Sequence, residues 1–392
     1  MQSISVPASE AGRRLDKYLM KYLDAAPKSF IYKAFRKKNI KLCGKRADGS
    51  EIVSSGDTIE LFFSDETLAS LKTAAKRRPD KQSDAIGGIR GVTRQAAIRE
   101  NKAGLAGSDG QTADEAGGNR LSKKQISCGY SKDGGHINMG DKAGLAGFCV
   151  IVYEDVNVIL ADKKAGILSQ KSDRRDYSLN EALLDYCGGK SDVFVPSVCN
   201  RIDRNTTGLV CFAKTYAAAR ELSRIIRDRE LEKYYIAAVR GVIRGENRID
   251  AWLMKDAASN TVEVSKTRLN GAEHIETAFR PVNAYESKLL GLSSPYGHIC
   301  GEEYTVLKVE LITGKSHQIR AQLAGTGHPL LGDSKYGDLR LNQRLKAEYG
   351  IRYQLLHAWE MRMPDELNFP LDNIAGKTFR TAVPESIKPL MR

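Results

Sequence analysis

The 392-residue sequence predicts an α+β fold with a small N-terminal module, a long glycine-rich segment and a larger domain whose mixed sheet is mainly antiparallel. Two amphipathic helical runs predict the module, and short apolar strands with few, scattered helices predict the larger domain. A parallel sheet needs a helix between successive strands, and the sequence lacks that regular alternation. We expect the boundaries at residues 1–63, 64–147 and 148–392.

The N-terminal module begins with two helical runs that separate apolar from basic residues. We expect helices at 13–23 and 28–37, and strands at 40–42 and 59–63, because apolar residues recur at helical spacing in both runs. The basic residues on the remaining faces are Arg13, Arg14, Lys17, Lys28, Lys33, Arg36, Lys37 and Lys38. A helix face that is merely exposed to solvent would carry the same basic residues, so their spacing alone does not predict a binding surface.

Hydrophobic periodicity fails between residues 64 and 147. Residues 87–147 contain 14 of the 35 glycines of the chain, and the hexapeptide KAGLAG occurs at both 102–107 and 142–147. This composition is typical of a low-complexity linker or of an insertion, and we expect one of the two here.

The larger domain alternates short apolar strands with a few helices. We expect strands at 149–155, 156–163, 208–215, 233–241, 304–314 and 355–364. The expected helices are 179–186, 217–227 and 317–323.

Composition narrows the class of partner. The 61 Lys and Arg residues exceed the 48 Asp and Glu residues, and the formal net charge of +13 favours an anionic partner such as nucleic acid. The seven cysteines form no CxxC pair and have no histidine at metal-ligand spacing, so we expect free thiols and no metal site. No apolar run reaches the roughly 20 residues that span a bilayer, and the N-terminus does not look like a secretory signal, so we expect a cytoplasmic protein without a membrane partner.

One short segment contains a basic and an acidic residue two positions apart. Arg201 and Asp203 lie two positions apart in NRIDRNTTGLV, residues 200–210, so an extended stretch projects both side chains to one side. Asp203 would equally serve a purely structural role by stabilising the turn before Thr206 and Thr207.

A second segment, residues 311–337, runs from a strand through a turn into a helix. Lys315, His317 and Arg320 cluster at the expected helix start, which favours anions. A capped helix with an exposed basic face explains the same residues. The GxxxxGK[ST] pattern of a phosphate loop is missing, so the sequence argues against an NTPase.

The N-terminal segments RRLDKYL, KSFIYKAFRKKNIKLCGK and SSGDTIEL resemble an S4 RNA-binding domain over nearly all of residues 11–63. The resemblance implies that the second helix and the following turn lie on RNA. With the two arginines of the first run, the expected RNA-binding residues are Arg13, Arg14, Lys28, Ser29, Lys33, Arg36 and Lys37. Cys43 stands where the family usually has Asn before the glycine of the turn, which leaves the local turn geometry open.

Segments of the larger domain resemble the RluA-type pseudouridine synthases over about residues 148–364. NRIDRNTTGL is similar to the family pattern HRLDxxTSGL, KYYIAAVRG to KxYxAxVxG, and TGKSHQIR to TGRTHQIR, while LLHAW matches the family's LHA strand. An S4 domain before the catalytic domain is an arrangement known in this family, mostly in enzymes that act on ribosomal RNA.

The resemblance assigns roles to four residues of this chain. It implies that Asp203 is the catalytic aspartate, that Arg320 pairs with it, that Arg201 helps to extrude the target nucleotide and that Tyr235 stacks on the flipped uracil. Isomerisation of uridine breaks the bond from N1 to C1′ and joins C5 to C1′. This chemistry needs an ionised carboxylate but no cofactor, redox agent or metal.

Two residues depart from the family pattern. Asn200 stands where the family has His, and Lys315 stands where it usually has Arg. We expect Lys315 and His317 to contact the RNA backbone, although Lys315 lacks the bidentate geometry of an arginine.

The expected function is isomerisation of uridine in RNA, and the domain arrangement favours 23S ribosomal RNA over transfer RNA. A non-catalytic RNA-binding assembly factor is an alternative, against which the presence of Asp203, Tyr235 and Arg320 argues. A glycosidase would need a second carboxylate near Asp203. The matched segments offer no such partner.

Overall fold

The computed structural model describes residues 1–72, 142–173, 176–189, 193–256, 261–382 and 387–391. Most of the expected linker or insertion at 64–147 lies outside these residues. Within the described ranges, no helix combines the length and the apolar character that crossing a membrane requires.

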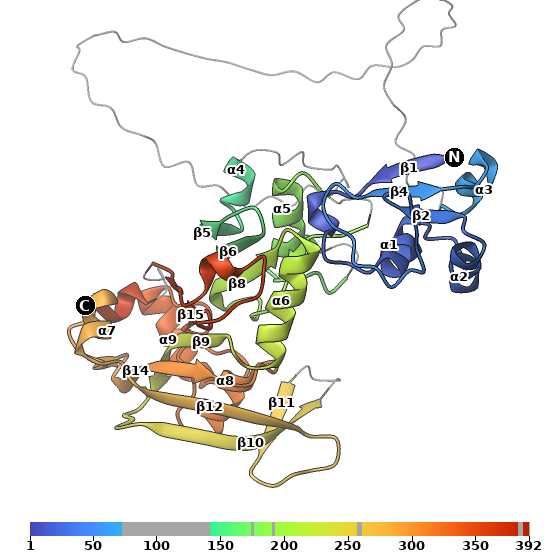
Figure 1. Cartoon of the computed structure of the whole chain (residues 1–392). Coiled ribbons are helices and arrows are strands. Elements are labelled where there is room, and N and C mark those ends of the chain that lie inside the picture. Colours follow the sequence, from blue (N-terminus) through green and yellow to red (C-terminus); the bar gives the residue numbers. More distant parts are fainter. Residues whose placement is uncertain (73–141, 174–175, 190–192, 257–260, 383–386, 392) are drawn as a thin grey trace, which may run out of the picture. The chain divides into compact units, whose positions relative to one another are not determined.

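The N-terminal module combines a four-stranded sheet with short helices (Figure 1). Its antiparallel strands lie in the order β1 (Gln2–Ser5), β4 (Thr58–Leu61), β2 (Ile40–Leu42) and β3 (Lys45–Arg46). Its helices are η1 (Ala8–Glu10), α1 (Leu15–Tyr22), α2 (Lys28–Arg36) and α3 (Asp65–Ser70). Leu15 of α1, Phe35 of α2 and Ile59 of β4 belong to one apolar core. The expected helices and strands are confirmed to within a few residues, whereas β1, β3 and α3 were not expected.

The turn between β2 and β3 contains Cys43, the residue that departs from the resemblance to an S4 domain. Cys43 and Gly44 both have positive φ angles, 50° and 75°. Two consecutive residues of this kind form the tight turn that best joins two antiparallel strands. Cys43 therefore adopts the left-handed conformation that Asn adopts more readily.

The larger domain is built on one sheet, for which twelve strands are described. Nine strands lie side by side in the order β11 (Thr261–Ser265), β10 (Asn247–Asp256), β12 (Glu273–Pro281), β14 (Glu302–Leu311), β9 (Glu232–Arg240), β15 (Leu356–Arg362), β8 (Thr207–Ala213), β6 (Val158–Lys163) and β5 (Cys149–Glu154). The other three pair with β14, β15 and β8 respectively: β13 (Tyr296–Ile299), β16 (Thr378–Arg380) and β7 (Ser197–Val198). Strand β15 pairs with β8 in parallel and with β9 antiparallel. The predicted mixed, mainly antiparallel sheet is confirmed.

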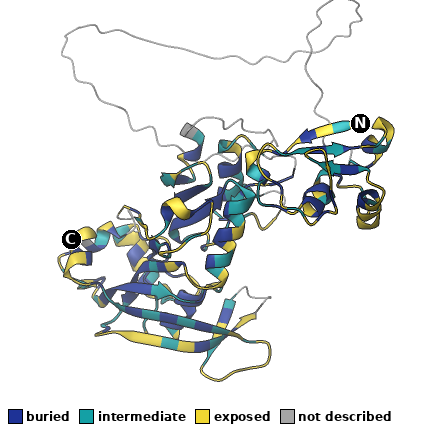
Figure 2. Cartoon of the chain, viewed as in Figure 1, coloured by how far each residue is buried: buried dark blue, intermediate teal, exposed yellow. Residues whose placement is uncertain are grey.

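Helices cover both faces of this sheet (Figure 1). They are α4 (Lys142–Leu145), α5 (Leu179–Tyr186), α6 (Tyr216–Arg227), α7 (Ala284–Leu289), α8 (Gln318–Gly325), α9 (Leu339–Tyr349), η3 (Asp372–Ile374) and η4 (Lys388–Met391). On the central strand β9, Tyr235 packs in the core that includes residues of α5 and α8, and the next residue, Ile236, packs in the core that includes residues of α9. The central strands are accordingly buried (Figure 2).

The elements expected in the larger domain are confirmed, most of them to within two residues. Residues 242–303 carried no expected element, yet they form β10 to β13 and α7. The helix expected at 179–186 is reproduced in full by α5.

Gly208, the second residue of β8, allows β8 and β15 to approach each other. Its φ is 111°, and a Cβ atom built on it would lie 2.2 Å from the carbonyl oxygen of Ala358 in β15. The parallel pairing of β8 with β15 places these two residues side by side. A residue with a side chain would therefore be strained here and would also separate the two strands.

We predict that Gly208→Ala lowers the free energy of unfolding by about 3 kcal/mol or more, because backbone strain and steric overlap both contribute. Urea denaturation of the two proteins measures the difference. Gly245→Ala is the matched control, since Gly245 also has a positive φ, 71°, but no atom within 4 Å of the added Cβ. Equal losses in the two variants would contradict the role assigned to the close approach of β8 and β15.

Candidate active site

Asp203 lies in the loop between β7 and β8. The backbone N–H of Thr206 donates to the carbonyl oxygen of Asp203 at 3.1 Å, so the turn suggested by the sequence is formed. The Asp203 carboxylate is 25% exposed, and Nη1 of Arg320 donates to its Oδ2 at 2.8 Å. The turn and the ion pair thus coexist, because the first uses the backbone of Asp203 and the second uses its side chain.

Arg320 is buried on α8 and is shared between two carboxylates. Its Nε and Nη2 donate to the two carboxylate oxygens of Asp333 at 2.7 and 2.9 Å, while its Nη1 reaches Asp203. Asp333 is fully buried and also accepts backbone N–H groups of Lys335 and Tyr336. Burial by itself would raise the pKa of Asp333, but Arg320 and these two N–H groups hold the pKa below its ordinary value. The guanidinium is therefore fixed on one edge and presents the other edge to Asp203.

Two buried side chains anchor the loop on either side of Asp203. Lys163, at the end of β6, donates to the carbonyl oxygens of Lys164 at 2.9 Å, Ile167 at 2.8 Å and Arg204 at 2.9 Å. Burial lowers the pKa of Lys163 to about 7. Ser169 Oγ donates to the carbonyl oxygen of Ile202 at 2.9 Å and accepts the N–H of Ile202 at 3.1 Å.

The end of the loop is held from β15. Thr207 Oγ1 lies 2.6 Å from His357 Nδ1, and His357 Nε2 lies 2.5 Å from Thr381 Oγ1. Burial lowers the pKa of His357 to about 3, so this imidazole is neutral and links two hydroxyl groups. Gln354 donates to Thr206 Oγ1 at 3.2 Å.

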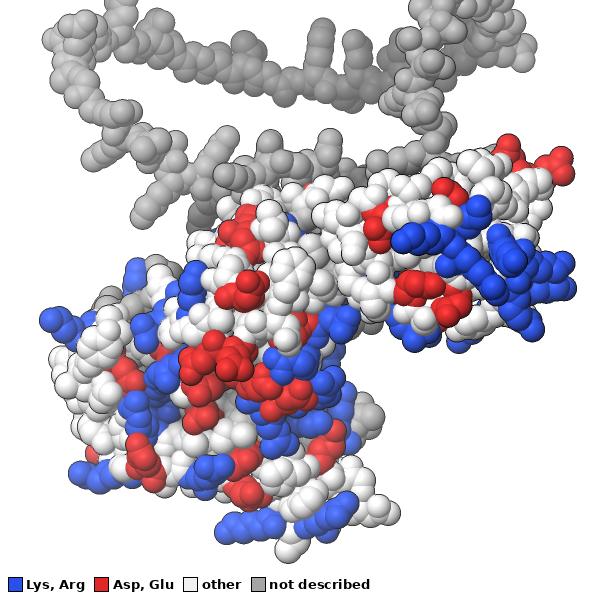
Figure 3. Space-filling model, in the orientation of Figure 1, with Lys and Arg blue, Asp and Glu red and all other residues white. Residues whose placement is uncertain are grey.

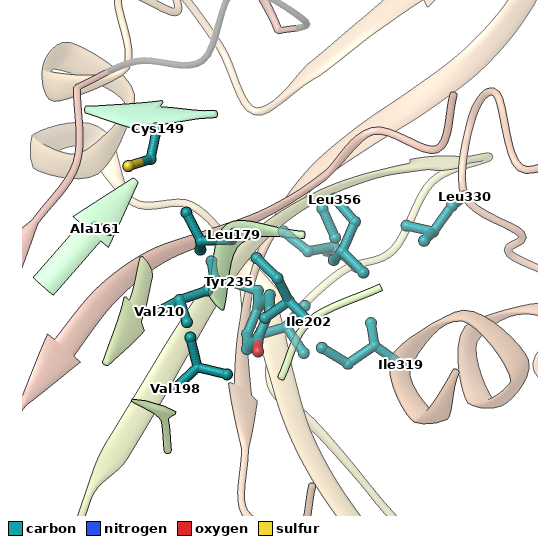
Figure 4. Packing of buried hydrophobic residues seen from close by; sticks show 14 of the residues in the cluster. Cys149, Ala161, Leu179, Val198, Ile202, Val210, Tyr235, Ile319, Leu330 and Leu356 are labelled. Carbon is teal, nitrogen blue, oxygen red and sulfur yellow. The ribbon is translucent and has the colours of Figure 1, made fainter. Parts of the chain in front are cut away.

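The structure brings Tyr235 close to the loop but buries it. Its side chain is 5% exposed and packs with Ile202, Val210 and Leu356 (Figure 4). Burial raises the pKa of Tyr235, and the nearby Asp203 carboxylate raises it further. Stacking of this ring on a target base stays a prediction.

Arg201 and the two residues that depart from the family pattern, Asn200 and Lys315, have different surroundings. Arg201 is exposed, and its guanidinium forms no ion pair with any residue that the structure describes. Asn200 accepts the backbone N–H of Cys211 at 2.7 Å and thereby ties the loop to β8. Lys315 forms an ion pair with Glu273, so its charge already has a partner.

His317 differs from the expectation of a residue directed at the RNA backbone. Its side chain is 13% exposed and its Nε2 lies 4.0 Å from Asp203 Oδ2. The imidazole is directed into the site because His317 precedes α8 with a left-handed backbone, φ 56°.

The basic residues expected to bind RNA in the N-terminal module divide into two groups. Lys28, Ser29, Lys33 and Arg36 are exposed on α2 and Lys37 is exposed directly after it, in the region where Figure 3 shows Lys and Arg gathered. Arg13 is corrected by the structure, because its guanidinium is buried and pairs with Glu10. Arg14 is exposed, but Asp16 accepts two of its N–H groups at 3.1 and 3.2 Å.

Sequence reasoning missed the partners that hold the site together. Asp333 lies in GDSKYG, residues 332–337, for which no role is predicted, and Lys163 lies at the end of an apolar strand. A lysine at the end of an otherwise buried strand was the one available signal, since such a residue needs several acceptors.

We predict that Asp333→Asn lowers the free energy of unfolding by about 3 kcal/mol, because it leaves the buried guanidinium of Arg320 with one carboxylate partner instead of two. Chemical denaturation followed by circular dichroism measures this difference. Asp250→Asn is the matched control, because Asp250 is 66% exposed and pairs only with His274 among the described residues. If Asp333→Asn were as stable as Asp250→Asn, Asp333 would not be the residue that anchors Arg320.

Comparisons with known proteins identify the family of the chain. The family model of RNA pseudouridylate synthases matches residues 157–325, which include Asp203, Tyr235 and Arg320. An uncharacterized RNA pseudouridine synthase of Mycoplasma pneumoniae is 33% identical over 240 residues, which are 59% of this chain and 68% of that protein. The tRNA pseudouridine synthase C of Pasteurella multocida is 31% identical over 53% of this chain and 82% of its own length. The ribosomal large subunit pseudouridine synthase C of Vibrio vulnificus is 24% identical over 95% of this chain and 93% of its own length. The chain therefore belongs to the RluA family of RNA pseudouridine synthases.

Proposed function

We propose that this enzyme converts uridine to pseudouridine in ribosomal RNA of the large subunit, and that Asp203 is the carboxylate that performs the chemistry. The observation that carries the proposal is the contact between Asp203 and Arg320. An ion pair at 2.8 Å holds Oδ2 of Asp203, while no hydrogen bond from the described residues reaches its Oδ1. One carboxylate oxygen is therefore fixed and the other is left to react.

The reaction needs a carboxylate beside the sugar of the target nucleotide. Asp203 would either attack C1′ and form a covalent intermediate or remove a proton from the sugar to give a glycal. In either case the bond from N1 to C1′ breaks, the uracil rotates and C5 bonds to C1′. C5 then loses its proton and N1 takes one up, while Asp203 is released from C1′ or returns the sugar proton. The product is an isomer of the substrate, so electrons and atoms balance without a co-reactant.

Access to the nucleotide requires that the base leave its stack. Flipping costs a few kcal/mol, which a side chain that fills the vacated space can offset. We infer that the guanidinium of Arg201, which is exposed and stands two residues before Asp203, fills that space. Tyr235, under the same loop, is proposed to form the floor on which the uracil rests.

Two observations favour ribosomal RNA. The relative named for the ribosomal large subunit aligns with 95% of this chain, including the N-terminal module, whereas the relative named for tRNA aligns with 53%. The basic residues of α2 are exposed and form no ion pairs with the described residues, as expected of an S4-like surface that binds phosphates. Transfer RNA remains the alternative substrate.

We predict that Asp203→Asn abolishes pseudouridine formation, with at least a ~1,000-fold loss of kcat, because the amide is neither a nucleophile nor a base. RNA affinity should stay within about threefold, because the loop remains anchored by Lys163 and Ser169. Carbodiimide primer extension on 23S ribosomal RNA and on tRNA measures the product. Residual isomerisation in the variant would overturn the assignment of Asp203, and product found only in tRNA would overturn the choice of substrate.

The N-terminal module is tested by charge reversal on α2. We predict that Lys33→Glu with Lys37→Glu weakens RNA binding by about tenfold or more and reduces the slope of log K against log salt by about 2, because two phosphate contacts are lost. Lys288→Glu with Lys346→Glu changes the net charge equally at two exposed residues of α7 and α9. Equal losses from both pairs would mean that net charge, and not the surface of α2, binds the RNA.

A further inference from the structure

His317 has an unusual backbone that directs its side chain into the site. Its φ and ψ are 56° and 12°, a left-handed conformation that is uncommon outside glycine, although Asn, Asp and His adopt it more often than other residues. Its carbonyl oxygen accepts the N–H of Ala321 at 2.9 Å, so this conformation begins helix α8. Uncommon backbone conformations persist where the surrounding structure maintains them, and they are frequent at functional sites.

The hydrogen bonds of Tyr336 favour one of the two neutral tautomers of His317. Tyr336 Oη accepts the backbone N–H of Val262 at 2.9 Å and lies 3.0 Å from His317 Nδ1. A tyrosine hydroxyl has a single proton to donate. Since Val262 is a donor, that proton is available for Nδ1 of His317, which then acts as an acceptor. A neutral imidazole in this arrangement carries its own proton on Nε2.

The surroundings of His317 disfavour the charged form of its imidazole. Burial is the main cause that lowers the pKa of His317, and the cationic groups of Arg320 and Lys335 lower it further. The carboxylates of Asp203 and Asp333 act in the opposite direction without reversing the shift. In the tautomer that carries its proton on Nε2, this N–H faces Asp203.

Both donors are on the same side of the Asp203 carboxylate. Arg320 Nη1 lies 2.8 Å from Oδ2 and His317 Nε2 lies 4.0 Å from the same oxygen. A separation of 4.0 Å is too long for a hydrogen bond, but such contacts commonly shorten when a substrate completes an active site.

We propose that His317 is a positioning residue for Asp203. In the tautomer that Tyr336 favours, it donates from Nε2 to Oδ2 of Asp203 when the target nucleotide is bound. Arg320 and His317 then hold Oδ2 together, and Oδ1 alone faces the sugar. This inference rests on the proposed function of Asp203 and specifies which of its two oxygens reacts.

The tautomer can be measured without reference to activity. In the full chain labelled with 15N, long-range proton–nitrogen spectra distinguish the two nitrogens of each histidine, and the signals lost in His317→Gly identify His317. We expect the Nε2–H form in the wild type and a mixture of both forms in Tyr336→Phe. The Nδ1–H form in the wild type would overturn the proposal, whether or not the enzyme proves to isomerise uridine.

Kinetics then test the positioning role. His317→Gly suits the left-handed backbone but removes the imidazole, so the fold should persist while kcat falls by about tenfold or more and KM stays within about threefold. His317→Gln restores an N–H donor and should recover part of the loss. His298→Gln, at a histidine that is 72% exposed, is the control and should leave both constants unchanged.

Three outcomes would contradict the proposal. An unchanged kcat in His317→Gly would show that only the backbone conformation matters. A raised KM with unchanged kcat would show that His317 binds the RNA backbone instead. Equal losses in the Gly and Gln variants would exclude the donor role. If the wild type itself formed no pseudouridine in either RNA, the proposed function would fail, and the tautomer would still decide the inference.

Discussion

The candidate site depends on one guanidinium that two carboxylates share. Arg320 is buried, and a buried arginine without a partner would destabilise the fold by several kcal/mol. Asp333 compensates its charge and fixes its plane, so that one edge remains for Asp203. The position of the Asp203 carboxylate therefore follows from a salt bridge to which Asp203 itself does not belong.

The loop around Asp203 is rigid for a different reason. Lys163 of β6 and Ser169, which follows β6, form hydrogen bonds with the backbone of the loop. The neutral imidazole of His357 in β15 links Thr207, at the end of the loop, to Thr381. Buried polar groups of this kind stabilise a fold only when each has a partner. The loop thus has one favoured conformation, in which the side chain of Asp203 is left outside the network.

The sequence predicted the sheet and the pairing of Asp203 with Arg320 because both leave local signals, apolar alternation and matching motifs. Asp333 left none, since a turn aspartate and a buried ion-pair partner look the same until the chain is folded. His317 was assigned to the RNA backbone because its type and position suggested an anion site. Its inward direction arises from a backbone angle that no spacing rule predicts. Arg13 was placed on an exposed helix face, yet its side chain is buried against Glu10.

Strand β15 has a consequence for the order in which the site forms. It lies between β8, which follows the Asp203 loop, and β9, which carries Tyr235, although it is synthesised more than 100 residues after both. Contacts between such distant segments form slowly, and the N-terminal part of a chain leaves the ribosome first. A nascent chain that lacks residues 356–362 has no strand to join the two halves of the sheet. The candidate site therefore cannot be complete before residues 356–362 have been synthesised and have paired with β8 and β9.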